Sequence, residues 1–190
     1  AKSDPVAKIA DASVQRLLAN PSANLAEDAQ IKADLTAVAQ QTGENVQLGR
    51  AVSLDAPADG TVGGYLYSTA GKGKIAVLMA VSGGAAQDVV NQLGMHIVAA
   101  RPIALDRSQV PADVVAKERE IAVEQAKATG KPQQIAEKIA EGKLNAFYAE
   151  RVLLDQDFIN AEVFKGKVGD FLKGKGVTLS KYVRVEVGQK

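Results

Sequence analysis

Residues 61–100 have the sequence TVGGYLYSTAGKGKIAVLMAVSGGAAQDVVNQLGMHIVAA, and no other stretch is as informative about the fold class. It contains two runs rich in β-branched and aromatic residues, Val62–Ser68 and Lys74–Val81, which are typical of strands. Gly71-Lys72-Gly73 lies between them and predicts the tight end of a β-hairpin. Ala85–Ala100 then carries apolar residues at helical spacing. A hairpin followed directly by a helix predicts an α+β protein with antiparallel sheet.

The segments on either side of this stretch add helices and two further strands. Pro5 stands where the first turn of a helix tolerates proline, and Gly43 is placed to end a second helix. Apolar and polar residues alternate after Gly43 and again near the C-terminus, and this alternation predicts strands. We expect helices at Pro5–Ala19, about Leu25–Gln41, Pro111–Thr129, about Pro132–Glu141, Lys143 to about Leu153 and Val168–Lys173, and strands at Asn45–Leu54 and Leu179–Val187.

The order of these elements predicts two small subdomains of antiparallel sheet and packed helices. The first would comprise residues 1–54 and remain incomplete, and the second would comprise residues 55–190. Both outer strands carry an arginine among β-branched residues, Arg50 and Arg184. This similarity suggests a weak internal repeat, in which only the second subdomain would have its hairpin.

A helical hairpin is expected at about residues 111–152. Its helices carry charges of both signs, their apolar stripes are thin, and Gly130-Lys131-Pro132 separates them. Thin stripes suit a seam between two helices better than a thick core. The pattern therefore predicts a hairpin that projects into solvent.

Composition excludes several classes of protein. The 190 residues include 23 Lys and Arg against 22 Asp and Glu, and the net charge of +1 gives no general reason to bind nucleic acid or an anionic membrane. The absence of cysteine excludes disulfides, zinc–thiolate sites and thiol catalysis. A single histidine cannot form a His-based metal site. No apolar run approaches the roughly 18 residues of a membrane helix, and no signal peptide is visible.

The sequence contains no motif that indicates catalytic chemistry. Gly71-Lys72-Gly73-Lys74 lacks the spacing of a phosphate-binding loop and is followed by a strand, so a plain turn is expected. Gly60–Gly64 precedes a strand and does not open a helix, unlike a dinucleotide-binding fingerprint. The acidic residues of the charged helices have Lys and Arg neighbours and indicate solvated faces. His96 is expected to be partly buried or to lie at a surface contact, with a protein interface left open. We therefore expect a binding or scaffolding protein and not an enzyme.

Several blocks resemble translation elongation factor Ts, and they follow the order of that family over about residues 40–190. Each block alone is weak evidence, whereas the ordered set is specific. The blocks are Thr42–Val46, Gly94–Pro102, Val110–Glu118, Thr129–Pro132, Ile135–Lys143, Leu153–Phe158, Val168–Leu172 and Val183–Gly188. At the front, Ala1-Lys2 is similar to the last pair of the family's Thr-Asp-Phe-Val-Ala-Lys motif. In that register the Asp-Phe pair would precede the chain.

The resemblance implies a guanine-nucleotide exchange factor for the GTPase elongation factor Tu, with no cofactor. It implies that Thr42, Gly43, Glu44 and Asn45 contact the nucleotide-binding domain, and that Met95 and His96 make distal contacts with the partner. Ala1 and Lys2 would also belong to the partner-binding surface. Thr42 stands where the family usually has isoleucine. Gly43 as a helix C-cap and Asn45 as a turn residue are equally open interpretations.

The resemblance also implies a location in the bacterial cytoplasm or in an organellar matrix or plastid stroma, and a possible homodimer through the core. Because the Asp-Phe pair lies in the wedge that the family inserts near the magnesium site, we expect this chain alone to bind the GTPase weakly and to exchange nucleotide poorly. The alternative is a non-exchanging structural, dimerising or ribosome-associated protein built on the same core.

Overall fold

The structure is a computed structural model and describes residues 5–84, 86–130 and 132–189. The chain forms two compact units, which are described separately: unit 1 comprises Ala1–Asp55 with Val185–Lys190, and unit 2 comprises Ala56–Arg184. The described residues include helices and a three-stranded antiparallel sheet, so the predicted α+β class is confirmed.

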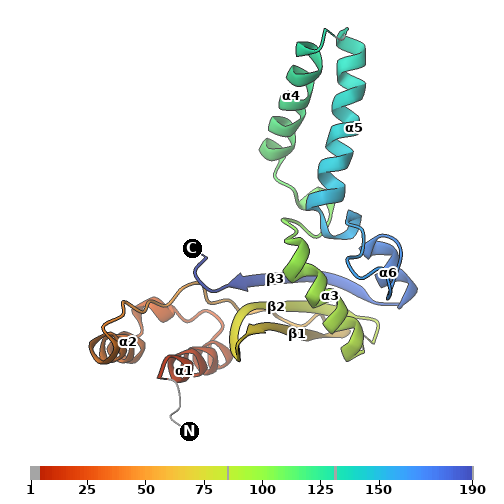
Figure 1. The fold of residues 1–190 in the computed structure, drawn as a ribbon. Helices are drawn as coiled ribbons and strands as arrows, with labels where there is room; N and C mark the ends of the chain where they lie inside the picture. The colour runs from red at the N-terminus through yellow and green to blue at the C-terminus, as the bar shows by residue number, and fades with distance from the viewer. Residues whose placement is uncertain (1–4, 85, 131, 190) are drawn as a thin grey trace. The chain divides into compact units, whose positions relative to one another are not determined.

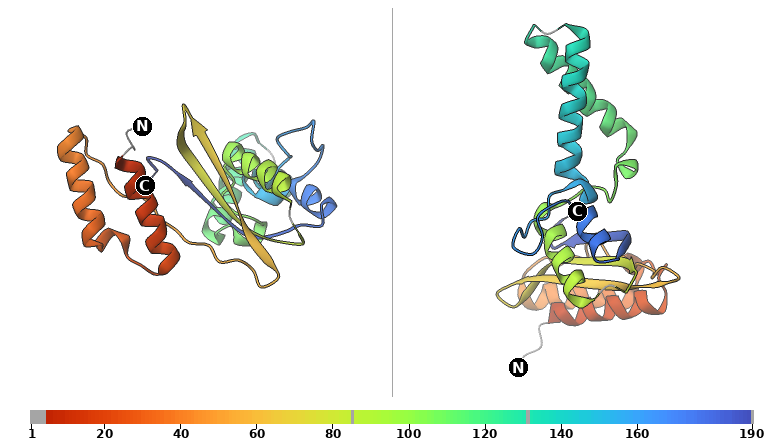
Figure 2. Two further views of the ribbon diagram at one scale, coloured as in Figure 1. Left: turned by 90° about the horizontal axis from the view of Figure 1, so that it is seen from below. Right: turned by 90° about the vertical axis from the view of Figure 1, so that its right-hand side faces the viewer.

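Unit 1 is built on two helices that pack side by side, α1 (Pro5–Ala19) and α2 (Ala29–Thr42) (Figure 2). A 3₁₀ turn, η1 (Leu25–Glu27), connects them. Asp28 caps α2, because its carboxylate accepts a 2.9 Å hydrogen bond from the Ile31 N–H, and it also pairs with Arg16. The small core of this unit consists of Ile9, Leu25, Ile31 and Val38.

The predicted strand at Asn45–Leu54 is wrong, because the structure assigns this segment no strand. The alternation that suggested it is nevertheless real: Val46, Leu48, Val52 and Leu54 are half-buried, and the residues between them are exposed. Val46 and Leu48 pack against the core of unit 1. A strand also needs a hydrogen-bonded neighbour, and the described residues offer this segment none. The suggested internal repeat therefore has no second sheet in the described part of the chain.

Unit 2 contains the predicted hairpin, β1 (Gly60–Thr69) and β2 (Lys72–Ser82). The strands are antiparallel, with Thr61 opposite Val81. The turn is Ala70-Gly71, one residue earlier than expected, and both residues have positive φ, at 50° and 73°. A two-residue turn of this kind matches the right-handed twist of its strands. The last strand, β3 (Thr178–Glu186), lies beside β2 and completes the order β1-β2-β3.

Helix α3 (Gln87–Ala100) crosses one face of this sheet (Figure 1). Glycines allow the close approach: a Cβ on Gly94 would overlap Tyr65, and one on Gly63 would lie 2.8 Å from Val90 Cγ1. The main core lies between α3, the sheet and the short helix α6 (Val168–Gly174). Its most buried members are Val77, Met79, Val81, Leu93, Ile97, Leu153 and Val168.

The predicted helical hairpin is formed by α4 (Ala112–Ala128) and α5 (Gln133–Arg151), which extend away from the sheet of unit 2 (Figure 1). The expected break between two helices near Gly142 is wrong, because α5 is continuous. A glycine inside a helix costs only about 1 kcal/mol relative to alanine, which the flanking turns outweigh. The seam is thin as predicted, and alanines fill it: Ala122, Ala126, Ala136 and Ala140. The base of the hairpin adjoins two 3₁₀ turns, η2 (Arg107–Gln109) and η3 (Leu153–Asp155).

Candidate functional site

The residues Thr42–Asn45 form an exposed polar turn at the end of α2. Gly43 has φ 73°, and its N–H donates to Ala39 O at 2.9 Å, so it is a left-handed helix C-cap. Thr42 Oγ1 donates to Val38 O at 2.8 Å and accepts from the Glu44 N–H at 3.2 Å. These bonds fix the backbone of the turn. The structure thus assigns Gly43 its capping role, and the role in partner contact remains a prediction.

Glu44 and Asn45 present their side chains to solvent. Neither side chain has a hydrogen-bond or ion-pair partner among the described residues. Directly beyond them, Val46 is anchored on the core of unit 1. The polar groups of the turn are therefore held in place by capping on one side and apolar packing on the other, and they remain available to a partner.

A shallow groove of about 270 Å³ runs between α1 and α2 and ends near this turn. Ile9 and Val38 line its apolar part, and Lys8 and Asp34 supply charges of opposite sign. Gln41, which also lines the groove, is the residue before Thr42.

The second predicted group, Met95 and His96, lies on α3 in unit 2. Met95 is half-buried, and His96 is fully buried at 0% exposure. The His96 ring stacks on Phe158, with centroids 5.5 Å apart. Since the imidazole has no exposed surface in this chain, a direct contact with a partner is not available in this conformation, and the contact role of His96 remains a prediction.

Both ring nitrogens of His96 have partners. Nδ1 accepts from the Ile159 N–H at 3.2 Å, so the proton of the neutral ring is on Nε2, which donates to Gln156 Oε1 at 3.0 Å. Burial lowers the pKa of His96, and the hydrogen bond to Gln156 opposes that shift only in part. The neutral tautomer with Nε2–H is the form that this environment accepts.

Gln156 and Phe158 are functional candidates to which sequence reasoning gave no role. They lie 60 and 62 positions from His96, so no periodicity links them to α3. The only available signal was the Leu153–Phe158 block that resembles a family motif. In the structure, this block supplies both the hydrogen-bond acceptor for His96 and the ring that stacks on it.

The predicted residues do not form one described site. Thr42–Asn45 belong to unit 1, and Met95 and His96 belong to unit 2. Ala1 and Lys2 lie outside the described residues, so the structure places neither.

The part of the chain that the structure describes contains no cluster of His, Asp and Glu that could hold a metal ion. Within the same residues, no helix combines the length and apolar character needed to span a bilayer.

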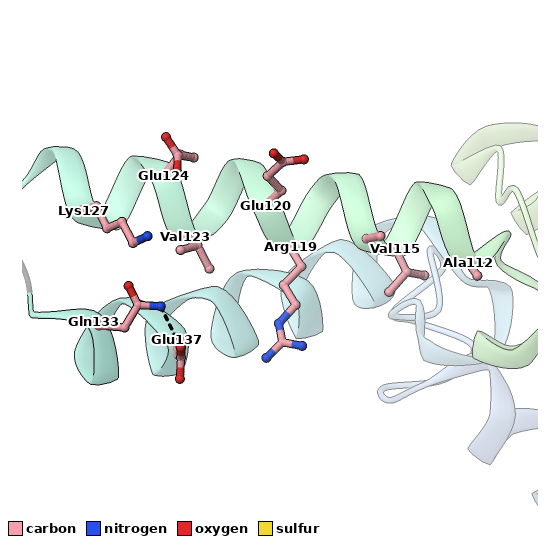
Figure 3. A pocket seen from close by; sticks show the side chains of 10 residues that line it. Ala112, Val115, Arg119, Glu120, Val123, Glu124, Lys127, Gln133 and Glu137 are labelled. Atoms are coloured by element: carbon pink, nitrogen blue, oxygen red, sulfur yellow. Dashed lines mark hydrogen bonds between the residues drawn. The ribbon is translucent and has the colours of Figure 1, made fainter.

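A groove of about 560 Å³ follows the helical hairpin (Figure 3). Val115 and Val123 of α4 give it apolar patches, and Arg119 and Glu124 stand among its charges. On the α5 wall, Gln133 Nε2 donates to Glu137 Oε1 at 2.7 Å (Figure 3). The groove has charges of both signs and is separate from the predicted contact residues.

Comparisons with known proteins assign the family. The sequence profile of one family, described as Elongation factor TS, matches residues 3–189. Elongation factor Ts of Francisella tularensis subsp. novicida is 40% identical over 147 residues, which are 77% of this chain and 47% of the relative. Elongation factor Ts of Thioalkalivibrio sulfidiphilus is 35% identical over 185 residues, which are 96% of this chain and 61% of the relative. The chain thus spans about half to three fifths of the length of these curated relatives. Since the profile covers nearly the whole chain, the chain belongs to the elongation factor Ts family.

Proposed function

We propose that this chain binds the GTPase elongation factor Tu and promotes the release of its GDP. The observation that carries the proposal is the family match over residues 3–189. The exposed turn at Thr42–Asn45, whose backbone is fixed by hydrogen bonds, supports it, because the resemblance implies that these residues contact the nucleotide-binding domain. A chain acting in this way is an exchange factor and not an enzyme, since no covalent bond changes, and it requires no cofactor.

The physical basis of exchange is thermodynamic linkage. If the chain binds the nucleotide-free GTPase more tightly than the GDP form by some factor, it must weaken GDP binding by the same factor. A ligand with equal affinity for both forms would shift nothing, however tightly it bound. The contacts that matter are therefore those made only with the nucleotide-free form.

We assign the polar turn, Thr42, Gly43, Glu44 and Asn45, to the nucleotide-domain side of the partner. Met95 belongs to the distal contact, with His96 buried behind it. Ala1 and Lys2 are assigned to the partner-binding surface through the motif that they resemble. The partner is a protein and neither a nucleic acid nor a membrane, and the bacterial relatives favour a cytoplasmic location.

Size-exclusion chromatography with nucleotide-free elongation factor Tu tests the proposal. At protein concentrations high enough to populate a weak complex, we expect a complex that GDP with magnesium dissolves. A complex that persists with GDP and magnesium would favour the alternative of a binding protein that does not exchange nucleotide, and absence of any complex would overturn the proposal.

A matched pair of variants tests the assigned turn. Asn45→Ala removes an exposed amide from the turn, and Asn24→Ala removes an exposed amide from the same unit that makes no capping hydrogen bond. We expect only Asn45→Ala to weaken the complex and to slow release of a fluorescent GDP analogue. Equal effects of both variants would remove the turn from the interface.

A further inference from the structure

The buried side chain of Gln156 lies where two helices end. Its Nε2 donates to the carbonyl oxygen of Glu150 in the last turn of α5 at 2.6 Å, and to that of Ala100, the last residue of α3, at 3.4 Å. The last carbonyls of a helix have no partner inside the helix. Gln156, which is 4% exposed, therefore caps the C-terminal ends of α3 and α5 with a single amide group.

His96 fixes the orientation of that amide. Its Nε2–H donates to Gln156 Oε1 at 3.0 Å, while Nδ1 accepts from the Ile159 N–H. If the amide were flipped, Oε1 would face two carbonyl oxygens, and the Nε2 hydrogens of Gln156 would face the imidazole N–H. A single tautomer of His96 and a single orientation of Gln156 thus satisfy every polar atom of both buried side chains.

This network joins the helical hairpin to the helix that carries Met95, because α5 is one arm of the hairpin. Further ties lie at the same base. The backbone supplies three hydrogen bonds: Ile103 N–H to Arg151 O at 2.9 Å, Leu153 N–H to Ala104 O at 2.9 Å and Leu154 N–H to Leu105 O at 3.1 Å. Arg107 supplies another tie through Asp155 at 2.8 Å, but its side chain is 50% exposed, so water and salt screen the pair. Gln156 adds a buried side-chain tie that reaches the ends of both helices.

We propose that His96 and Gln156 are positioning residues, which hold the α4–α5 hairpin in a fixed direction from α3, and that His96 affects partner binding through this joint. The part concerning the partner rests on the proposed function, whereas the part concerning the hairpin does not. The physical reason is that any other direction of the hairpin would leave buried donors and acceptors without partners, which is costly in an apolar surrounding. The hairpin and α3 therefore move as one body.

Pulsed electron–electron distance measurements test the joint directly. The chain has no cysteine of its own, so spin labels attach only at the two introduced cysteines. These are Asn91→Cys on α3 and Lys127→Cys near the hairpin tip. Gln156→Met keeps the length of the side chain and removes all three hydrogen bonds, and we expect a broader or shifted distance distribution. Gln133→Met removes a glutamine bond on the exposed hairpin surface and should leave the distribution unchanged. Unchanged distances in a folded Gln156→Met chain would overturn the proposal.

Two substitutions of His96 separate the halves of the network. His96→Gln places an amide donor near the position of Nε2 and can retain the bond to Gln156. His96→Asn places an acceptor near the position of Nδ1 and can retain only the bond from Ile159. We therefore expect His96→Asn to broaden the distances and His96→Gln to keep them narrow. A broader distance distribution for His96→Gln than for His96→Asn would contradict the joint. Equal widths of the two distributions would do so as well, provided that both variants show a cooperative thermal unfolding transition.

The contribution to partner binding is measured with the same unlabelled variants and nucleotide-free elongation factor Tu. Gln156→Met and His96→Asn should weaken binding several-fold, and His96→Gln should restore most of the affinity. Loosened distances with unchanged affinity would refute the role in binding and leave the joint intact. If the unsubstituted chain does not bind, the proposed function fails, while the distance measurements still decide whether the joint exists.

Discussion

His96 illustrates what a single residue contributes when it is both buried and fully hydrogen-bonded. As the only histidine of the chain, it cannot form a His-based metal site. Its side chain is instead enclosed by Phe158, Gln156 and the backbone of Ile159. Because Nδ1 accepts the hydrogen bond from the Ile159 N–H, a proton on Nδ1 would break that bond and bring two N–H groups into repulsive contact. This residue should therefore make the stability of the chain depend on pH.

The first prediction concerns that pH dependence. Burial lowers the pKa of His96 below the 6.5 of an exposed histidine, so below about pH 6.5 the unfolded chain binds a proton that the folded chain rejects. The contribution of neutral His96 to the free energy of unfolding is then fully present above this pH. It decreases as the pH falls, by at most about 1.4 kcal/mol per pH unit. Urea unfolding at pH 7.5 and 5.5 measures the loss. His96→Gln should remove this component, and an identical pH dependence in both chains would contradict the assignment.

A second prediction separates the two roles of Gly43. No atom lies within 4 Å of a Cβ at this position, so substitutions act through the positive φ and not through a clash. Gly43→Ala should destabilise the fold by about 1 kcal/mol, and Gly43→Asn by less, because asparagine tolerates the left-handed conformation. Thermal unfolding gives the stabilities. Normal stability of Gly43→Asn with weakened binding to elongation factor Tu would show that the glycine also lies in the contact.

At the scale of elements, replacing either of two helical glycines by alanine should change the free energy of unfolding in opposite directions. Gly94 in α3 lies against Tyr65, whereas Gly142 in α5 has no atom near its missing Cβ. Gly94→Ala should destabilise by roughly 1–3 kcal/mol, because α3 must move away from β1 and overpacking outweighs helix propensity. Gly142→Ala should stabilise by up to about 1 kcal/mol. Chemical unfolding of the two variants decides, and a stabilised Gly94→Ala chain would contradict the close packing of helix on strand.

The same elements show what the sequence could predict. The hairpin, α1 and α3 were predictable because their periodicity, glycines and prolines act locally. The segment Asn45–Leu54 was not, because its alternation reports burial and cannot reveal whether another strand pairs with it. The helix break expected at Gly142 was wrong because a glycine inside a helix and a glycine that ends one differ in φ and not in sequence.

For the candidate site, the residue types predicted correctly that Gly43 caps a helix. The link between His96 and Gln156 required the tertiary fold.

At the scale of the whole chain, the two units differ in the size of their cores. Unit 1 buries Ile9, Leu25, Ile31 and Val38, with a few half-buried neighbours. The main core of unit 2 is larger and continuous across the sheet, α3 and α6. Since buried apolar area provides most of the stabilisation, and small cores are marginal, unit 1 should open at a lower free energy than unit 2.

Native-state hydrogen exchange tests this difference. Amides in α1 and α2 should exchange with opening free energies a few kcal/mol below those in β2 and α3, because local units open without global unfolding. Asp28→Ala removes the cap of α2 and its pair with Arg16, and it should accelerate exchange in α1 and α2 while leaving β2 unchanged. One common opening free energy for all four elements, with Asp28→Ala lowering it everywhere, would mean that the chain unfolds as a single cooperative body.

In the expected case, the polar turn at Thr42–Asn45 ends a helix of the less stable unit, so a partner that binds the turn also stabilises α2. Binding of elongation factor Tu should then slow exchange in α2 more than in β2, because the free chain opens there most readily.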